Sequence, residues 1–199
     1  MRTISINLYS FDELSNAAKE KALNYFRKNM DNYIDSSDII NTIEKIAAKC
    51  DLEGDYYSYD GTHYEVSFYM DNNIYGEEIE NLNGKRAFAY VMNNFISPSM
   101  ENKIYRIRYT NKTRKSRIFK SIDDCPFTGY IADYCFVEAF KEWKNQINNN
   151  VTVFDFIKLL EKKLSNEWNA EIDYMFSDEY IEEMIYCNEY EFLEDGTIY

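Results

Sequence analysis

The sequence predicts an α+β fold in which amphipathic helices pack on antiparallel β-hairpins. Three observations predict it. Apolar residues recur every three or four positions in several long segments, as on the buried face of a helix. In other segments apolar and polar residues alternate, as in a half-buried strand. The strand-like segments are neighbours joined by short turns, without the strand–helix–strand rhythm of a parallel sheet.

The N-terminal quarter is expected to form one strand and two helices. Thr3–Leu8 alternates as a strand does. Ser10 and Glu13 have the spacing of a capping box, in which each side chain accepts a hydrogen bond from the other residue's main-chain N–H, and a helix is predicted from there to Met30. A second helix is predicted from Ser37 to Cys50. The apolar residues expected to face inward are Leu14, Ala18, Ala22, Tyr25 and Phe26 in the first helix, and Ile39, Ile40, Ile43, Ile46 and Ala47 in the second.

The next segment predicts a hairpin followed by a helix. Asp60-Gly61 is typical of a two-residue turn, so residues 55–59 and 62–70 are expected to pair as antiparallel strands. A helix is predicted over residues 84–96, and Ser97-Pro98 is expected to end it.

The rest of the chain predicts a second hairpin and three helices. Two strands, 103–109 and 117–122, flank a basic loop, and helices are expected at 131–147, 153–175 and 178–187, the last two capped by Thr152 and Ser177. Residues 189–199 look strand-like around a turn at Asp195-Gly196. A single domain over residues 1–199 is predicted, with a soft boundary at 145–150.

The composition predicts a protein that folds without a cofactor. The 199 residues are 45% hydrophobic and 17% aromatic, which is enough apolar side chain to offset the entropy of an ordered chain. No uncharged apolar run approaches the length of a membrane span, and the N-terminus lacks the apolar stretch of a secretion signal. We therefore expect a cytoplasmic location, no membrane association, and reduced cysteines buried as small apolar residues.

Catalytic signatures are missing from the sequence, so no enzymatic activity is expected. His63 is the only histidine, which excludes a His-dependent triad or a multi-His metal site within one chain. Asp51, Glu53 and Asp55 have the first spacings of a calcium loop, but Tyr56 and Thr62 occupy the positions of its glycine and its bidentate glutamate. An enzyme that uses carboxylates and a metal stays open as a lesser alternative.

The charge of the chain is unevenly distributed. The net charge is -13, yet residues 103–120 hold eight basic residues and no acid, while residues 167–199 hold eleven acids and no Lys or Arg. Such asymmetry bears on partners and solubility. Solvation of an exposed surface is sufficient to explain both segments. The same two segments are also the candidate binding surfaces. The candidate partner-binding residues are Glu171, Asp173, Asp178, Glu179, Glu182 and Glu183 in the acidic segment, and Arg106, Arg108, Lys112, Arg114, Lys115 and Arg117 in the basic one.

The two ends of the chain resemble a family of uncharacterised bacteriophage and prophage proteins. Phe11 to Ala22 matches the family pattern FDELSxxAKxKA, and Asn188 to Tyr199 matches NxYxFxxDGxxY, while the middle of the chain departs from it. Members are sometimes labelled antitoxin-like. The resemblance implies an origin in a mobile element and brings no catalytic residues with it.

Taken together, these features predict a phage-type protein that binds and inhibits a host defence protein by stoichiometric occlusion, as an anti-CRISPR or a nucleic-acid mimic. The expected partner is a nucleic-acid-binding effector or nuclease. Direct binding of nucleic acid is disfavoured, because the net charge of -13 repels phosphates. The alternatives are an antitoxin that neutralises a partner toxin and a phage accessory protein.

Overall fold

The computed structural model describes residues 5–58, 61–70, 79, 81–99, 106–108, 117–119, 126–129, 132–146 and 150–199, and for 106–108 and 117–119 it describes the main chain alone. The contacts divide the chain into two compact units. Unit 1 comprises residues 1–35 and 170–199, and unit 2 comprises residues 36–169. The predicted soft boundary at 145–150 lies inside unit 2, and the prediction of a single domain stays a prediction.

Unit 1 brings the two ends of the chain together. Its elements are the 3-10 turns η1 (Phe11–Glu13) and η2 (Met30–Asn32) and the helices α1 (Asn16–Lys28) and α8 (Asp178–Cys187). The side chains of Ala22, Phe26, Ile181 and Phe192 are among those buried in its core. Each helix is capped at its N-terminus by a serine whose side chain accepts a main-chain hydrogen bond. The capping residue is Ser15 for α1 and Ser177 for α8.

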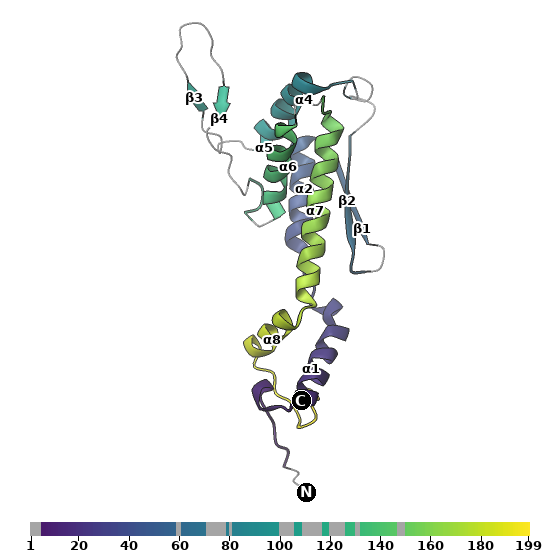
Figure 1. The fold of residues 1–199 in the computed structure, drawn as a ribbon, viewed down its shortest axis with the longest axis vertical. Helices are drawn as coiled ribbons and strands as arrows, with labels where there is room; N and C mark the ends of the chain where they lie inside the picture. The colour runs from purple at the N-terminus through teal and green to yellow at the C-terminus, as the bar shows by residue number, and fades with distance from the viewer. Residues whose placement is uncertain are drawn as a thin grey trace. The chain divides into compact units, whose positions relative to one another are not determined.

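Unit 2 consists of helices packed on a hairpin, which confirms the α+β prediction (Figure 1). Its elements are α2 (Ser37–Cys50), β1 (Glu53–Ser58), β2 (Tyr64–Tyr69), α4 (Gly84–Val91), the π-helix η3 (Met92–Ile96), α5 (Ser97–Ser99), β3 (Arg106–Arg108), β4 (Arg117–Phe119), α6 (Ala132–Asn145) and α7 (Val153–Met175), whose C-terminal end belongs to unit 1. β1 pairs antiparallel with β2, and β3 pairs antiparallel with β4. Gly61, with a φ of 84°, lies in the loop between β1 and β2.

An aromatic cluster fills the centre of unit 2. The ring of Phe156 on α7 lies 5.8 Å from that of Phe136 and 5.7 Å from that of Trp143, both on α6, and 5.9 Å from that of Phe95 on η3. All four side chains are buried. Edge-to-face and offset contacts of this kind add to the stabilisation that burial of aromatic surface provides.

Several predicted elements differ from the structure. Residues 5–8 form no strand, and Ile6 is 55% exposed, because only Tyr9 finds a partner, in an isolated bridge to Phe192. The capping box of Ser10 and Glu13 is present but caps the short η1, while α1 starts later. Tyr25, expected to face inward, is 51% exposed.

Two further corrections concern the ends of elements. Helix is assigned through Pro98 to Ser99, beyond the predicted stop. The π-turn of η3 lies directly before it, and this wider turn relaxes the hydrogen-bond pairing that a proline disrupts. Residues 189–199 form isolated bridges around the turn at Gly196 and no strand.

Candidate functional site

The N-terminal and C-terminal segments of the chain interlock within unit 1. The main chains of Tyr9 and Phe192 exchange two hydrogen bonds of 2.9 Å. Gly196 packs against α1 so closely that a Cβ there would lie 2.1 Å from the carbonyl oxygen of Ala18. The Lys21 ammonium group lies 2.7 Å from the Asp195 carboxylate, and it donates to the Thr197 hydroxyl at 2.8 Å. These contacts between the two segments therefore hold unit 1 together.

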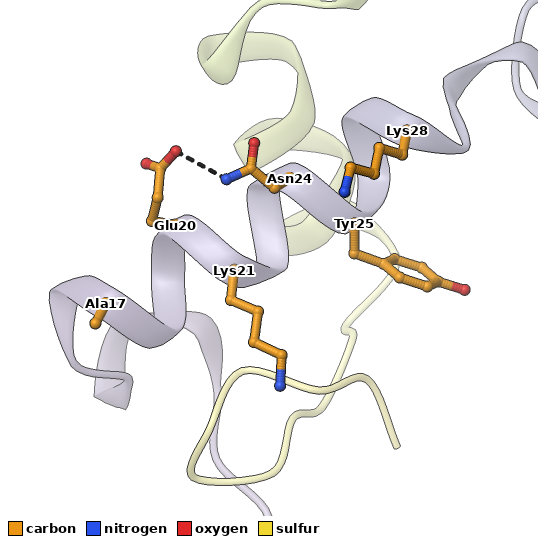
Figure 2. A pocket seen from close by; sticks show the side chains of 6 residues that line it. All are labelled: Ala17, Glu20, Lys21, Asn24, Tyr25 and Lys28. Atoms are coloured by element: carbon orange, nitrogen blue, oxygen red, sulfur yellow. Dashed lines mark hydrogen bonds between the residues drawn. The ribbon is translucent and has the colours of Figure 1, made fainter.

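A hollow of about 480 Å³ lies along the exposed side of α1 (Figure 2). Figure 2 shows Lys21 extending toward the C-terminal segment and Glu20 accepting a hydrogen bond from Asn24. Tyr25 and Lys28 line the other end. Since Lys21 is committed to Asp195 and Thr197, the hollow offers one further ammonium group and a tyrosine ring. This set of groups carries no catalytic arrangement.

Most of the predicted acidic residues are exposed and belong to unit 1. We name Glu171 and Asp173 at the end of α7, with Glu179, Glu182 and Glu183 on α8, the C-terminal acidic surface. All except the partly buried Glu182 are exposed. Carboxylates three and four positions apart on α8 share a helix face, where neighbouring side chains lie about 5–6 Å apart. The structure places all five residues in unit 1.

Asp178 is paired with a cation of unit 1. Its carboxylate pairs with the Arg27 guanidinium group of α1. The α8 helix begins at this residue, and a carboxylate in the first turn of a helix is favoured by the helix dipole. Asp178 therefore joins α8 to α1 and is excluded from the C-terminal acidic surface.

Exposed tyrosines accompany the acids. Tyr174 on α7 is 46% exposed and Tyr186 on α8 is 48% exposed. The Tyr186 hydroxyl donates to the Asp12 carboxylate at 2.6 Å, and this hydrogen bond, helped by the nearby charge of Glu182, raises the pKa of Tyr186 to about 12. Tyrosine is a favoured anchor at protein interfaces, because its ring is apolar and its hydroxyl can be hydrogen-bonded.

The charge of the whole chain is concentrated in unit 1. Fifteen of the 35 acidic residues and only 5 of the 22 basic residues belong to unit 1, which gives this unit a charge of -10. The other 20 acidic and 17 basic residues give unit 2 a charge of -3. Two of the five cations, Lys21 and Arg27, are paired inside unit 1.

The predicted basic surface lies only partly within the described residues. Lys112, Arg114 and Lys115 lie outside them. Arg106, Arg108 and Arg117 belong to the β3–β4 pair, in which Arg108 is the register partner of Arg117. These three arginines belong to unit 2, whereas the C-terminal acidic surface belongs to unit 1.

Two buried cysteines have the pKa values of unreactive thiols. Burial raises the pKa of Cys50 and that of Cys135 to about 12, so both thiols stay protonated at neutral pH. Cys187 is exposed. Within the residues that the structure describes, no three His, Cys, Asp or Glu side chains are grouped so as to hold a metal ion.

A buried carboxylate is one feature that the sequence analysis missed. Asp133 on α6 is fully buried, and its carboxylate accepts hydrogen bonds from the N–H groups of Phe127, Thr128 and Gly129 at 2.7–2.9 Å. It also accepts from the hydroxyls of Thr128, at 2.9 Å, and of Thr42 on α2, at 3.1 Å. Five donors on one carboxylate make Asp133 the joint between the 126–129 segment, α6 and α2. No spacing in the sequence identifies these partners.

No family model, no curated protein and no solved structure matches the chain. Among the helices of the described residues, none has the length and apolarity needed to cross a membrane.

Proposed function

We propose that the protein binds and inhibits a host defence protein by stoichiometric occlusion, as an anti-CRISPR or nucleic-acid mimic, and that the C-terminal acidic surface makes the contact. The observation that carries the proposal is the charge of -10 in unit 1, against -3 in the larger unit 2. A surface of this sign fits a partner with a basic nucleic-acid-binding cleft.

The arrangement of unit 1 supports such a mechanism. The cations Lys21 and Arg27 pair with Asp195 and Asp178, which are not part of the C-terminal acidic surface. Rows of carboxylates attract a basic cleft from a distance and accelerate encounter, which is an effect that salt weakens. Tyr174 and Tyr186 provide apolar contact area beside the carboxylates.

A pull-down identifies the partner. The tagged protein is incubated with host lysate treated with nucleases, washed at low and then high salt, and the bound proteins are identified by mass spectrometry. We expect one nucleic-acid-binding effector or nuclease in stoichiometric amount, released at high salt. A toxin encoded beside the gene would favour the antitoxin alternative, and recovery with phage particles or replication proteins would favour an accessory role.

Matched charge reversals test the surface. The double variant Glu179→Lys with Glu183→Lys changes two exposed acids of α8, one of them in its first turn. Asp38→Lys with Glu44→Lys makes the same change on α2 of unit 2. We expect the α8 pair to weaken partner binding about tenfold or more, and the α2 pair to leave it nearly unchanged. Equal effects would contradict the proposal, as would binding that is lost only on neutralising Arg114, Lys115 and Arg117.

A further inference from the structure

The two edges of the β1–β2 hairpin differ in whether their main-chain groups are hydrogen-bonded to another element. Along β2, alternate main-chain N–H groups donate to polar side chains of α7: Tyr64 to Asn169 at 2.8 Å, Val66 to Ser165 at 2.9 Å and Phe68 to Glu161 at 2.7 Å. Four residues of helix rise about 6 Å and two residues of strand about 6.7 Å, so the two repeats match. This α7 ladder closes the β2 edge.

The β1 edge is exposed to solvent. The N–H groups of Tyr64, Val66 and Phe68 point toward α7, so their register partners on β1, which are Ser58, Tyr56 and Gly54, turn their main-chain groups away from β2. The Tyr56 N–H donates to the adjacent Asp55 carboxylate at 2.8 Å, in agreement with this orientation. Residues 53–57 are all exposed.

The open face of this hairpin is acidic. Gly54 packs on α2, where a Cβ would lie 3.1 Å from the Ile43 side chain, so Glu53, Asp55 and Tyr57 belong to the opposite face of the strand. Tyr57 donates to Glu65 of β2 at 2.5 Å on that face. The two strands, residues 53–58 and 64–69, contain the acids Glu53, Asp55 and Glu65 and no Lys or Arg.

We infer that β1 accepts an extended, lysine- or arginine-bearing segment of a partner protein as a third strand. Main-chain hydrogen bonds to the outward groups of β1 would provide the affinity, as in other cases of strand addition. Glu53 and Asp55, two positions apart, would select for cations at alternate positions of the added strand, because opposite charges across a strand pair attract and like charges repel. This interface lies in unit 2 and is separate from the C-terminal acidic surface.

Peptide binding to the full chain tests the inference. The probe is a synthetic peptide that alternates lysine and valine, with its ends blocked. Two control peptides are used. In the first, glutamate replaces every lysine. In the second, the main-chain nitrogens that point to either side of the extended peptide carry N-methyl groups, so neither side can donate hydrogen bonds to β1. We expect the lysine peptide to bind, to protect the amides of Gly54 and Ser58 from hydrogen exchange, and to release at high salt. We expect neither control to bind.

Two single charge reversals locate the site. Glu53→Lys changes β1, and Glu44→Lys changes an equally exposed acid on α2. We expect about threefold weaker binding or more for Glu53→Lys, and no change for Glu44→Lys, with the circular dichroism of both variants unaltered.

Several outcomes would overturn the inference. They are the absence of binding by the lysine peptide, equal binding of the glutamate or N-methylated peptide, and binding that Glu53→Lys leaves unchanged. The reversals on α8 test the proposed function separately, because they leave β1 intact.

Discussion

At the scale of single residues, Gly196 is the most constrained position of unit 1. Its φ is 81°, and the Ala18 carbonyl occupies the space that a side chain would need. Gly61 provides a matched control, because its φ is 84° and nothing lies within 4 Å of a Cβ built there. We expect Gly196→Ala to lower the free energy of unfolding of unit 1 by more than about 2 kcal/mol, and Gly61→Ala to cost unit 2 about 1 kcal/mol. Urea denaturation measures both, and similar small losses would show that the α1 contact is loose.

In unit 2, the buried Asp133 is the single residue whose substitution we expect to be most informative about stability. Asp133→Asn keeps the shape of the side chain but replaces one carboxylate oxygen by an amide NH2 group. This group faces either the three N–H groups of residues 127–129, which share one oxygen, or the hydroxyls of Thr42 and Thr128, which donate to the other oxygen. Because the Asp133 side chain is fully buried, we expect a loss of at least about 2 kcal/mol in the free energy of unfolding. The exposed Asp38→Asn is the control. An unchanged urea midpoint for Asp133→Asn would mean that the 126–129 segment contributes nothing to stability.

At the scale of elements, the α7 ladder replaces the third strand that the hairpin lacks. Ser165→Ala removes the acceptor of the Val66 N–H. We expect this change to cost about 1–2 kcal/mol and to accelerate hydrogen exchange at Val66. Asn166→Ala, on the exposed neighbour, is expected to change neither. Unaltered exchange at Val66 in Ser165→Ala would show that water replaces the serine without loss.

Local signals predict the helices well and the strands less well. The bounds of α2, α7 and α8 agree with the prediction, because in each case a serine or threonine directly precedes a segment with a helical apolar period. Residues 5–8 and 189–199 alternate as strands do, yet strand formation needs a partner at a matching register, and only isolated bridges form. The hydrogen bond from Thr42 to Asp133 and those of the α7 ladder join residues 91 to 105 positions apart, which no local pattern encodes.

The C-terminal acidic surface is likewise predictable from the sequence only in part. The sequence predicts the acidic character of the C-terminal segment, because this property depends on composition alone. The sequence does not predict the pairing of Asp178 with Arg27, because the two residues are 151 positions apart. The exposed edge of β1 also depends on tertiary structure, since only the packing of α7 on β2 distinguishes the two edges of the hairpin.

At the scale of the whole molecule, unit 1 is expected to be sensitive to pH at both extremes. The hydrogen bonds from Lys21 and Thr197 lower the pKa of Asp195 to about 2. This stabilisation is present above the unfolded pKa and is lost as the pH falls through about 2. The pKa of Tyr186 is raised to about 12, so its contribution is present below its unfolded pKa and is lost as the pH rises through about 12.

The NMR signals of the Ala18 and Ala22 methyl groups report on unit 1, whereas both tryptophans, Trp143 and Trp168, report on unit 2. We expect Asp195→Asn to remove the acid-dependent loss of the alanine signals and Tyr186→Phe to remove the alkaline one. Neither variant should change the tryptophan fluorescence. A parallel loss of both reporters in the unaltered chain would show that the units unfold as one.

The pairing of Tyr9 with Phe192 also fixes the order in which the protein can mature on the ribosome. Residues 36–169 are translated before α8 and the residues around Gly196, so the apolar side of α1 stays uncovered until those C-terminal partners are made. A chain that stops before Phe192 would keep that side exposed and be open to proteolysis.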